Sequence, residues 1–282
     1  MIKLENTKRG LGICIKGDYE DLNELYDAIS QVSDLFFSTI TESILDDYKK
    51  NKIDEKQKEE YLDSYESMHD CILGLCYDIR HAYQGDRKIE YINENKYYSV
   101  DVLYPWMIYY MMFFRILDEE EFCKRDFQLL PFPYNQIAYQ RHKSILNYFN
   151  GEVWNCLIDF LGKTKTFTFY NVQEIYLCEI FAYINYFEAY CYYYCDINKS
   201  KSIRKSMLLT LLYECVNFRA KNNDYKQAVK KIEDTTHQKY LSLSKFNEDY
   251  MKIYRAKGII YTTDFAELEM SYGDVDWDNL KY

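Results

Sequence analysis

Glycine and proline are scarce in this chain, which has 9 and 3 of them in 282 residues. None of the glycines belongs to a Gly-rich phosphate loop, a dinucleotide-binding fingerprint or a Gly-x-Ser-x-Gly elbow. The sequence therefore lacks the motifs that would indicate nucleotide binding or serine hydrolysis.

Paired cysteines and metal-ligand spacings are missing as well. The 9 cysteines are an odd number without any Cys-x-x-Cys, so they do not form a disulfide framework. Met1–Glu5 has no apolar core of a secretory signal, and we expect a cytoplasmic protein. None of the 4 histidines lies at a zinc-ligand spacing, so we predict neither a metal nor a cofactor.

Uninterrupted apolar runs of membrane-spanning length are also absent. Residues 102–117 are broken by Pro105 and Arg115, and residues 176–195 carry two glutamates and an asparagine. A transmembrane helix needs about 20 predominantly apolar residues. Both segments are therefore predicted to be buried helices, and no membrane partner is expected.

Charge is plentiful and changes sign along the chain. The formal charge of −10 argues against nonspecific nucleic-acid binding by the chain as a whole. Residues 199–231 nevertheless hold nine lysines or arginines against two acids. We interpret this segment as a solvated face that pairs with the acidic segment 262–282, and a phosphate or nucleic-acid contact is the alternative.

Two pairs of segments with a period of two are predicted to form β-hairpins. The first hairpin joins Met1–Glu5 to Leu11–Lys16, and the second joins Arg87–Ile92 to Tyr97–Leu103 through a four-residue loop. Phe265–Ser271 alternates as well and could return as a further strand of the same sheet.

Apolar residues at helical spacing predict helices between and after the hairpins. Asp18 is the expected N-cap of the first helix. The charged segment 34–66 is expected to form two exposed helices or one helix with a break near Asn51. A helix over 68–84 should end at Gly85, which can adopt the left-handed conformation of a C′ residue.

Pro105 is expected to fix the start of a central, almost entirely apolar helix. The remaining chain is mostly helical, with helices predicted at Tyr134–Phe149, Glu152–Gly162, Val172–Cys195, Ser202–Lys221, Tyr225–Thr235 and Tyr240–Lys257.

These elements predict an α+β protein. A small antiparallel sheet of two hairpins, with a C-terminal strand as a potential addition, should pack on helices and continue into a larger all-helical C-terminal portion. We divide the chain into an α+β portion, 1–120, with an acidic helical insertion near 34–66, and a mainly helical portion, 121–282. The two portions are expected to form one cooperative unit.

Polar residues gather at the end of the predicted 68–84 helix. Asp78 and His81 are three residues apart and can meet on one face, and Gly74 lies one turn before Asp78 and opens space beside it. If the chain is an enzyme, Asp78 would orient His81 for acid/base catalysis.

Arg80 and Gln84 form a second pair, four residues apart, and Arg87 follows the glycine that ends the helix. These three residues are the predicted ligand-binding residues, with the arginines supplying an anion contact. Helix capping is the alternative explanation, because a cation in the last helical turn gains roughly 0.3 to 1 kcal/mol from the helix dipole. Both interpretations stay open.

Three stretches of the chain resemble an uncharacterised bacterial family, a domain of unknown function. They are Gly17–Tyr26 (GDYEDLNELY), Leu73–Arg87 (LGLCYDIRHAYQGDR) and Tyr97–Pro105 (YYSVDVLYP). The resemblance implies a cytosolic bacterial protein and brings no established activity with it.

We therefore expect a non-enzymatic cytosolic interaction or regulatory protein that binds a protein partner or a small anionic ligand. The alternative is an enzyme or effector that acts on a nucleotide or nucleic acid, for example in bacterial defence. In that case His81 would be the general acid/base, Asp78 its orienting residue, and the basic segment 199–231 the phosphate contact.

Overall fold

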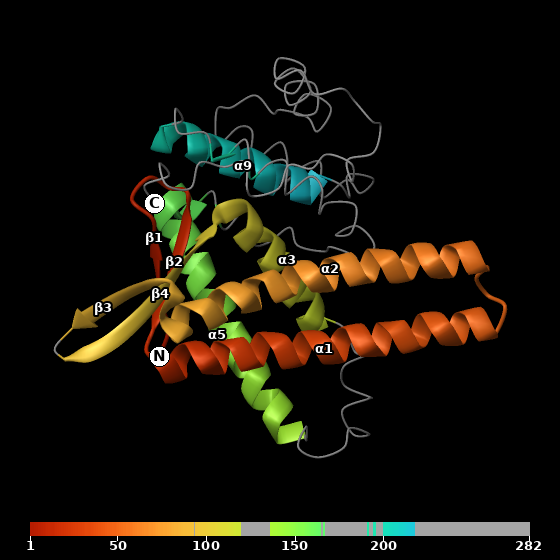
Figure 1. Ribbon diagram of the computed structural model, residues 1–282. Helices are drawn as coiled ribbons and strands as arrows, with labels where there is room; N and C mark the ends of the chain where they lie inside the picture. Colours follow the sequence, from red (N-terminus) through yellow and green to blue (C-terminus); the bar gives the residue numbers. More distant parts are fainter. Residues whose placement is uncertain are drawn as a thin grey trace, which may run out of the picture. The chain divides into compact units, whose positions relative to one another are not determined.

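The computed structural model describes residues 1–92, 94–119, 136–164, 166, 191, 194–195 and 200–217. Figure 1 shows the strands and helices of these ranges, coloured along the sequence. The strand predicted at Phe265–Ser271 and the helices predicted at Tyr225–Thr235 and Tyr240–Lys257 lie outside the described residues, and so does most of Val172–Cys195.

A small antiparallel sheet has the strand order β1 (Lys3–Asn6), β2 (Gly12–Gly17), β4 (Asn95–Leu103) and β3 (Lys88–Ile92). Both predicted hairpins are therefore confirmed, and with the surrounding helices they confirm the α+β class. Gly12 allows close approach of β2 to β4, because a Cβ atom there would lie 1.9 Å from the backbone oxygen of Val102.

The loop of the second hairpin is shorter than predicted. Ile92 pairs with Asn95, so two residues connect β3 to β4 and not four. Asn95 and Lys96 continue β4 although they are polar, because both are exposed at the end of the hairpin and keep their hydration there. Glu94 has a φ of +69°, the left-handed conformation that two-residue hairpin loops require.

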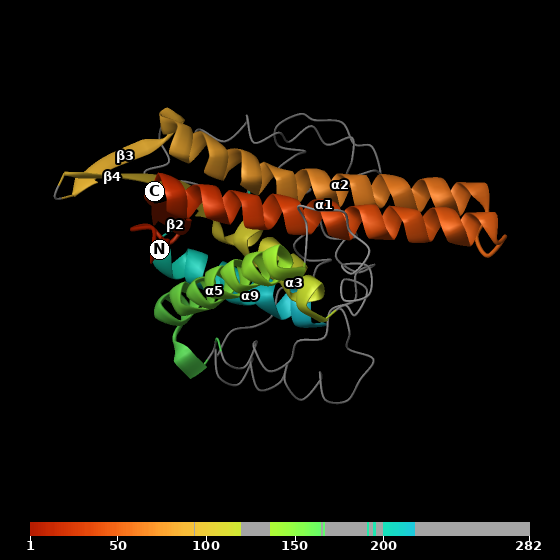
Figure 2. The same ribbon diagram turned by 90° about the horizontal axis from the view of Figure 1, so that it is seen from below.

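Two long helices, α1 (Tyr19–Lys49) and α2 (Glu55–His81), lie side by side in both views (Figure 1 and Figure 2). Each begins at an aspartate N-cap, Asp18 or Asp54, whose side chain forms a capping box with the N3 residue. The prediction for Asp18 is thus confirmed. Asn51 lies between the helices with a φ of +54°, which confirms the break predicted there.

The charged segment 34–66 is helical on both sides of Asn51, as predicted, and forms the second half of α1 and the first half of α2. Phe36, Phe37 and Ile44 are buried and extend the apolar face of α1 into this segment. The helix continues because apolar side chains keep recurring at helical spacing among the charges.

After α2 the chain makes one π-helical turn, η1 (Ala82–Asp86), before it enters β3. Gly85 has a φ of +94° within this turn, which confirms the left-handed residue predicted for the end of the helix. Figure 2 shows that the β3–β4 hairpin then extends beyond this end of the two long helices.

The helix α3 (Tyr104–Glu119) includes Pro105 in its first turn, and all residues from 104 to 111 are buried. This confirms the central apolar helix. The helix α9 (Lys201–Asn217) confirms the first part of the prediction Ser202–Lys221, whose last four residues lie outside the described ranges.

One helix, α5 (Gln136–Leu161), replaces the two that were predicted on either side of Gly151. Phe149 and Val153 are both buried, so the apolar face runs on past the glycine. A glycine inside a helix costs about 1 kcal/mol relative to alanine, and this burial outweighs the cost.

The contacts divide the chain into two compact units whose segments alternate along the sequence: Met1–Leu4, Cys14–Val100 and Tyr110–Val153 form the first, and Glu5–Ile13, Asp101–Tyr109 and Trp154–Tyr282 the second. In the first unit, the rings of Phe36 and Phe37 lie 5.6 and 5.7 Å from the ring of Phe113. In the second, Tyr104 stacks on Phe160 at 5.1 Å. Within the described ranges, no helix has the length and apolar character needed to cross a membrane.

Candidate functional site

The last turns of α2 turn one face to the core and the opposite face to solvent. Leu75, Cys76 and Ile79 are buried, and burial raises the pKa of Cys76 to about 12, so its thiol stays protonated and is no nucleophile. Gly74 and Tyr77 lie on the exposed side. The predicted site residues stand on this side or in the turn that follows it.

Asp78 forms an ion pair with Arg87, and the distance between its carboxylate oxygen and the guanidinium nitrogen is 2.8 Å. The turn at Gly85 brings the chain back past the helix end, which places Arg87 next to a residue nine positions earlier. The proposed contact between Asp78 and His81 is therefore replaced by a contact with Arg87. Both partners are partly exposed, so the pair contributes at most about 1 kcal/mol.

His81 has a different carboxylate partner, Asp86, whose oxygen lies 2.7 Å from the Nδ1 atom of the imidazole. The π-helical turn brings these residues together across five positions. The ring of Tyr77 packs against the imidazole, with ring centroids 4.1 Å apart. Sequence reasoning missed Asp86 because it assumed regular α-helical spacing up to Gly85. Tyr77 could have been found, since it lies four residues before His81 in the same regular helix.

Arg80 is the cation of this cluster that forms no ion pair with a described acid. Its guanidinium carbon lies 5.4 Å from the ring centroid of Tyr77, which is within the range of a cation–π interaction. Its Nε atom is shielded from solvent and has no hydrogen-bond partner among the described residues. In the same part of the chain, no hydrogen bond joins Arg80 to Gln84, which is exposed, so the predicted pair is not formed.

The end of α2 is held firmly against the start of α1 by three tyrosines. The ring of Tyr83 lies 5.3 Å from that of Tyr19 and 6.1 Å from that of Tyr26, both with edge-on geometry. Burial raises the pKa of Tyr83, with neighbouring tyrosines as a further cause, so its hydroxyl stays neutral at physiological pH. The helix end that carries Arg80 is thus fixed to α1 by packed tyrosine rings.

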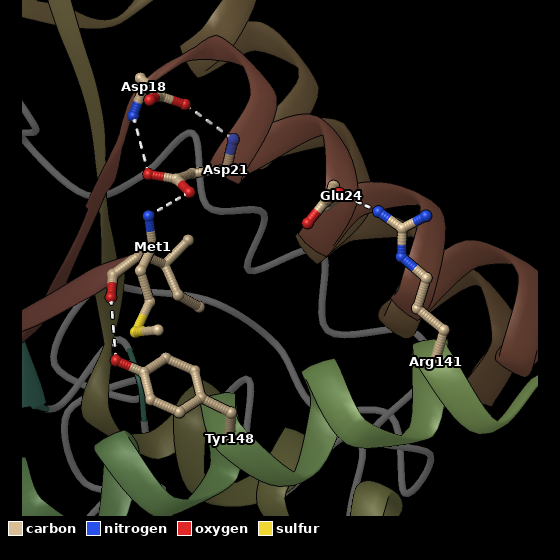
Figure 3. A network of polar contacts seen from close by, with 7 residues as sticks. Met1, Asp18, Asp21, Glu24, Arg141 and Tyr148 are labelled. Atoms are coloured by element: carbon tan, nitrogen blue, oxygen red, sulfur yellow. Dashed lines mark hydrogen bonds and ion pairs between the residues drawn. The ribbon is translucent and has the colours of Figure 1, made fainter.

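A second polar network lies at the start of α1 (Figure 3). Asp21 accepts from the α-amino group of Met1 and from the backbone N–H of Asp18, and Glu24 pairs with Arg141 of α5. Tyr148, also of α5, donates to the backbone oxygen of Ile2 at 3.3 Å. The polar groups in Figure 3 are paired with one another, so this network serves to hold β1, α1 and α5 together.

The basic segment 199–231 is described only in part, through α9. Arg204 is 1% exposed, and its guanidinium donates to the backbone oxygens of Tyr194 and Arg9 at 3.2 and 3.4 Å. This arginine supports the turn of the first hairpin and is not available to a phosphate in solution. Among the residues that the structure describes, no three metal-ligating side chains converge.

The chain matches the model of a family described as a domain of unknown function (DUF6904) over residues 2–43 and 50–254. It belongs to this family. The match confirms the resemblance to a domain of unknown function. The three stretches that suggested it lie within the matched residues of this DUF6904 protein. No curated protein and no solved structure matches the chain.

The polar cluster at the end of α2 contains groups that can bind a partner and one group that can exchange a proton. It combines an exposed tyrosine, an arginine without a described carboxylate partner and an exposed amide at one helix end. The His81–Asp86 pair adds an imidazole–carboxylate contact of the kind found in catalytic dyads, and the thiol of Cys76 on the same helix is buried and protonated.

Proposed function

We propose that this DUF6904 protein is a non-enzymatic, cytosolic bacterial interaction or regulatory protein. It binds an anionic group, carried by a protein partner or by a small ligand, at the end of α2. Arg80 makes the principal contact, and the observation that carries the proposal is its guanidinium, which stacks on Tyr77 and has a shielded Nε atom without a hydrogen-bond partner among the described residues.

Among the described residues, the two acids of the cluster are each paired with a side chain other than Arg80. Asp78 is paired with Arg87, and Asp86 is paired with His81. Leaving a buried donor unpaired costs about 1 to 3 kcal/mol. Arg80 as a whole is half-buried, so an acceptor from solution can approach part of its side chain, and pairing of the shielded Nε–H requires the side chain to move. A carboxylate or phosphate can then accept two parallel hydrogen bonds from the guanidinium.

Tyr77 beside Arg80 is exposed, and so is Gly74, one helical turn before Asp78. The side chain of Tyr77 is 51% exposed, and tyrosine and arginine are the residue types that most often dominate the binding energy of interfaces. No atom lies within 4 Å of the position of a Cβ atom on Gly74, so a partner can approach the backbone of α2 there. Gln84 and Arg87 are the further ligand-binding residues that we predict.

Native mass spectrometry of the full chain isolated from its host cells tests this proposal. We expect a co-purifying ligand or partner with the wild-type protein and its loss with Arg80→Ala. The matched control is Lys58→Ala. The ammonium nitrogen of Lys58 lies 4.5 Å from the ring centroid of Tyr48, which is a similar cation–π contact near the other end of the same helix pair. Retention of the bound species by Arg80→Ala, or its loss in both variants, would refute the assignment.

An enzyme or effector acting on a nucleotide or nucleic acid is the second candidate, and the 2.7 Å contact between His81 and Asp86 favours it. His81 would be the acid/base group with Asp86, in place of Asp78, as its orienting residue. This candidate predicts that the protein binds a heparin column at low salt and elutes as salt rises. It also predicts that His81→Gln abolishes turnover while the protein stays folded; flow-through at low salt would count against it.

A further inference from the structure

The strand β3 forms an edge of the sheet in the first unit. It pairs with β4 on one side, and no other described strand pairs with its second side. Alternate residues of an edge strand turn their N–H and C=O groups to the open side, where they can pair with another chain. The hairpin also stands clear of the ends of α1 and α2 (Figure 2).

Large apolar side chains are exposed on this strand. Tyr91 is 72% exposed and Ile92, its neighbour, is 45% exposed. Because successive residues of a strand point to opposite faces, these two side chains leave apolar surface on both faces of the hairpin. Neither a proline nor a bulge protects β3, whose sequence is KIEYI.

The charges of β3 alternate in a self-complementary way. Lys88 and Glu90 lie on the same face, separated by Ile89, and their side chains are 2.7 Å apart. Hydrogen bonds from Lys16 and Lys88 lower the pKa of Glu90 to about 2, so this carboxylate is ionised at neutral pH. An antiparallel copy of β3 centred on Ile89 would place Lys88 opposite Glu90 twice.

We propose that the open edge of β3 binds a second copy of this chain, with the two β3 strands antiparallel about a two-fold axis at Ile89. The pairing joins two sheets into one continuous sheet. Each Lys88 faces the Glu90 of the other copy, and each Arg87 faces its Tyr91. A register centred on Glu90 would bring the two Glu90 carboxylates opposite each other, which cross-strand pairing disfavours. The pairing does not depend on the Arg80 site.

Sedimentation of the full-length protein from about 1 µM to about 1 mM measures this association. We expect a concentration-dependent doubling of mass. Lys88→Glu sets glutamates opposite each other, and Glu90→Lys sets lysines opposite each other, so each variant should dimerise about tenfold more weakly or worse. Mixing the two variants restores both charge pairs and should restore the dimer, as a heterodimer.

The matched control is Lys96→Glu, which makes the same charge change on β4 of the same hairpin, away from the open edge, and should leave the dimer intact. Circular dichroism verifies that each variant is folded. A monomer throughout the concentration range, or a dimer that none of the β3 substitutions weakens, would overturn the proposal.

A cysteine at the two-fold axis tests the register. Antiparallel strands hold opposite Cα atoms about 4.5 to 5.5 Å apart, which is within reach of a disulfide. Ile89→Cys should therefore form a covalent dimer under mild oxidation. Tyr91→Cys should not exceed the wild-type background, because in this register Tyr91 faces Arg87 of the other copy. Cross-linking in the opposite order would exclude a two-fold axis at Ile89.

Discussion

Replacing Gly74 by alanine should stabilise the fold, although it changes a residue inside α2. Gly74 lies seven residues before the end of the helix, is exposed, and has open space around the position where a Cβ atom would be. The added methyl group meets no atom within 4 Å, so it introduces no clash and buries little surface. The change in stability then reduces to the helix propensity of the two residues.

Alanine is favoured over glycine in a helix interior by about 0.5 to 1 kcal/mol, chiefly because the unfolded glycine chain has more conformational freedom to lose. For a chain of this size, a gain of that order raises the melting temperature by roughly 1 to 3 °C. Urea denaturation should show a higher midpoint with an unchanged slope, because the folded state and the exposed area of unfolding are the same.

Two other glycines provide the controls. Gly151→Ala has the same open surroundings within α5 and should stabilise to a similar degree. Gly85→Ala should destabilise by about 1 kcal/mol or more, because an alanine strains at a φ of +94°. If Gly74→Ala lowers the stability while Gly151→Ala raises it, the surroundings of Gly74 are not open and a partner cannot approach the backbone of α2 there.

Three further changes test the packing and the electrostatics. Ser33→Ala should raise the stability by about 1 kcal/mol in urea denaturation, because the Ser33 hydroxyl is fully buried without a hydrogen-bond partner among the described residues; a loss of stability would reveal an unrecognised partner. Asp18→Ala should cost about 1 kcal/mol through loss of the capping box of α1, and an unchanged midpoint would contradict this. Glu90→Gln should lower the free energy of unfolding by a constant amount above pH 5. This difference should vanish as the pH falls from about 4.5 towards 2, because Lys16 and Lys88 lower the pKa of Glu90 in the folded state. A difference between the two proteins that grows in acid would contradict this.

Much of the fold could be predicted from the sequence because local signals and burial agree there. The alternation in β2 places Ile13 and Ile15 in the core, and the Asp18 cap stands directly before the first apolar residues of α1. It was harder to predict where one helix continues and where it ends. Gly151 is a breaker by composition, yet α5 continues through it, since Phe149 and Val153 are anchored by tertiary packing that a local pattern does not contain.

The predicted position of the polar cluster at a helix end is confirmed, but the predicted pairing of its side chains is wrong. Asp78, Arg80 and His81 all stand at the end of α2, as the sequence suggested. The partners of Asp78 and His81 depend on the π-helical turn, which shifts Asp86 and Arg87 relative to a regular helix end. The buried role of Arg204 was likewise invisible in the sequence, because its acceptors are backbone oxygens ten and 195 positions away.

The central claim concerns the Nε–H group of Arg80, and nuclear magnetic resonance of the arginine side chains observes that group directly. The protein is titrated with inorganic phosphate and, separately, with a short glutamate-rich peptide, each up to about 10 mM. We predict that the Nε–H signal of Arg80 shifts with at least one probe, while that of Arg204, which donates to the Tyr194 oxygen inside the fold, stays in place. An Arg80 signal that does not move with either probe, or that moves only together with the Arg204 signal, would contradict an anion-binding role for the end of α2.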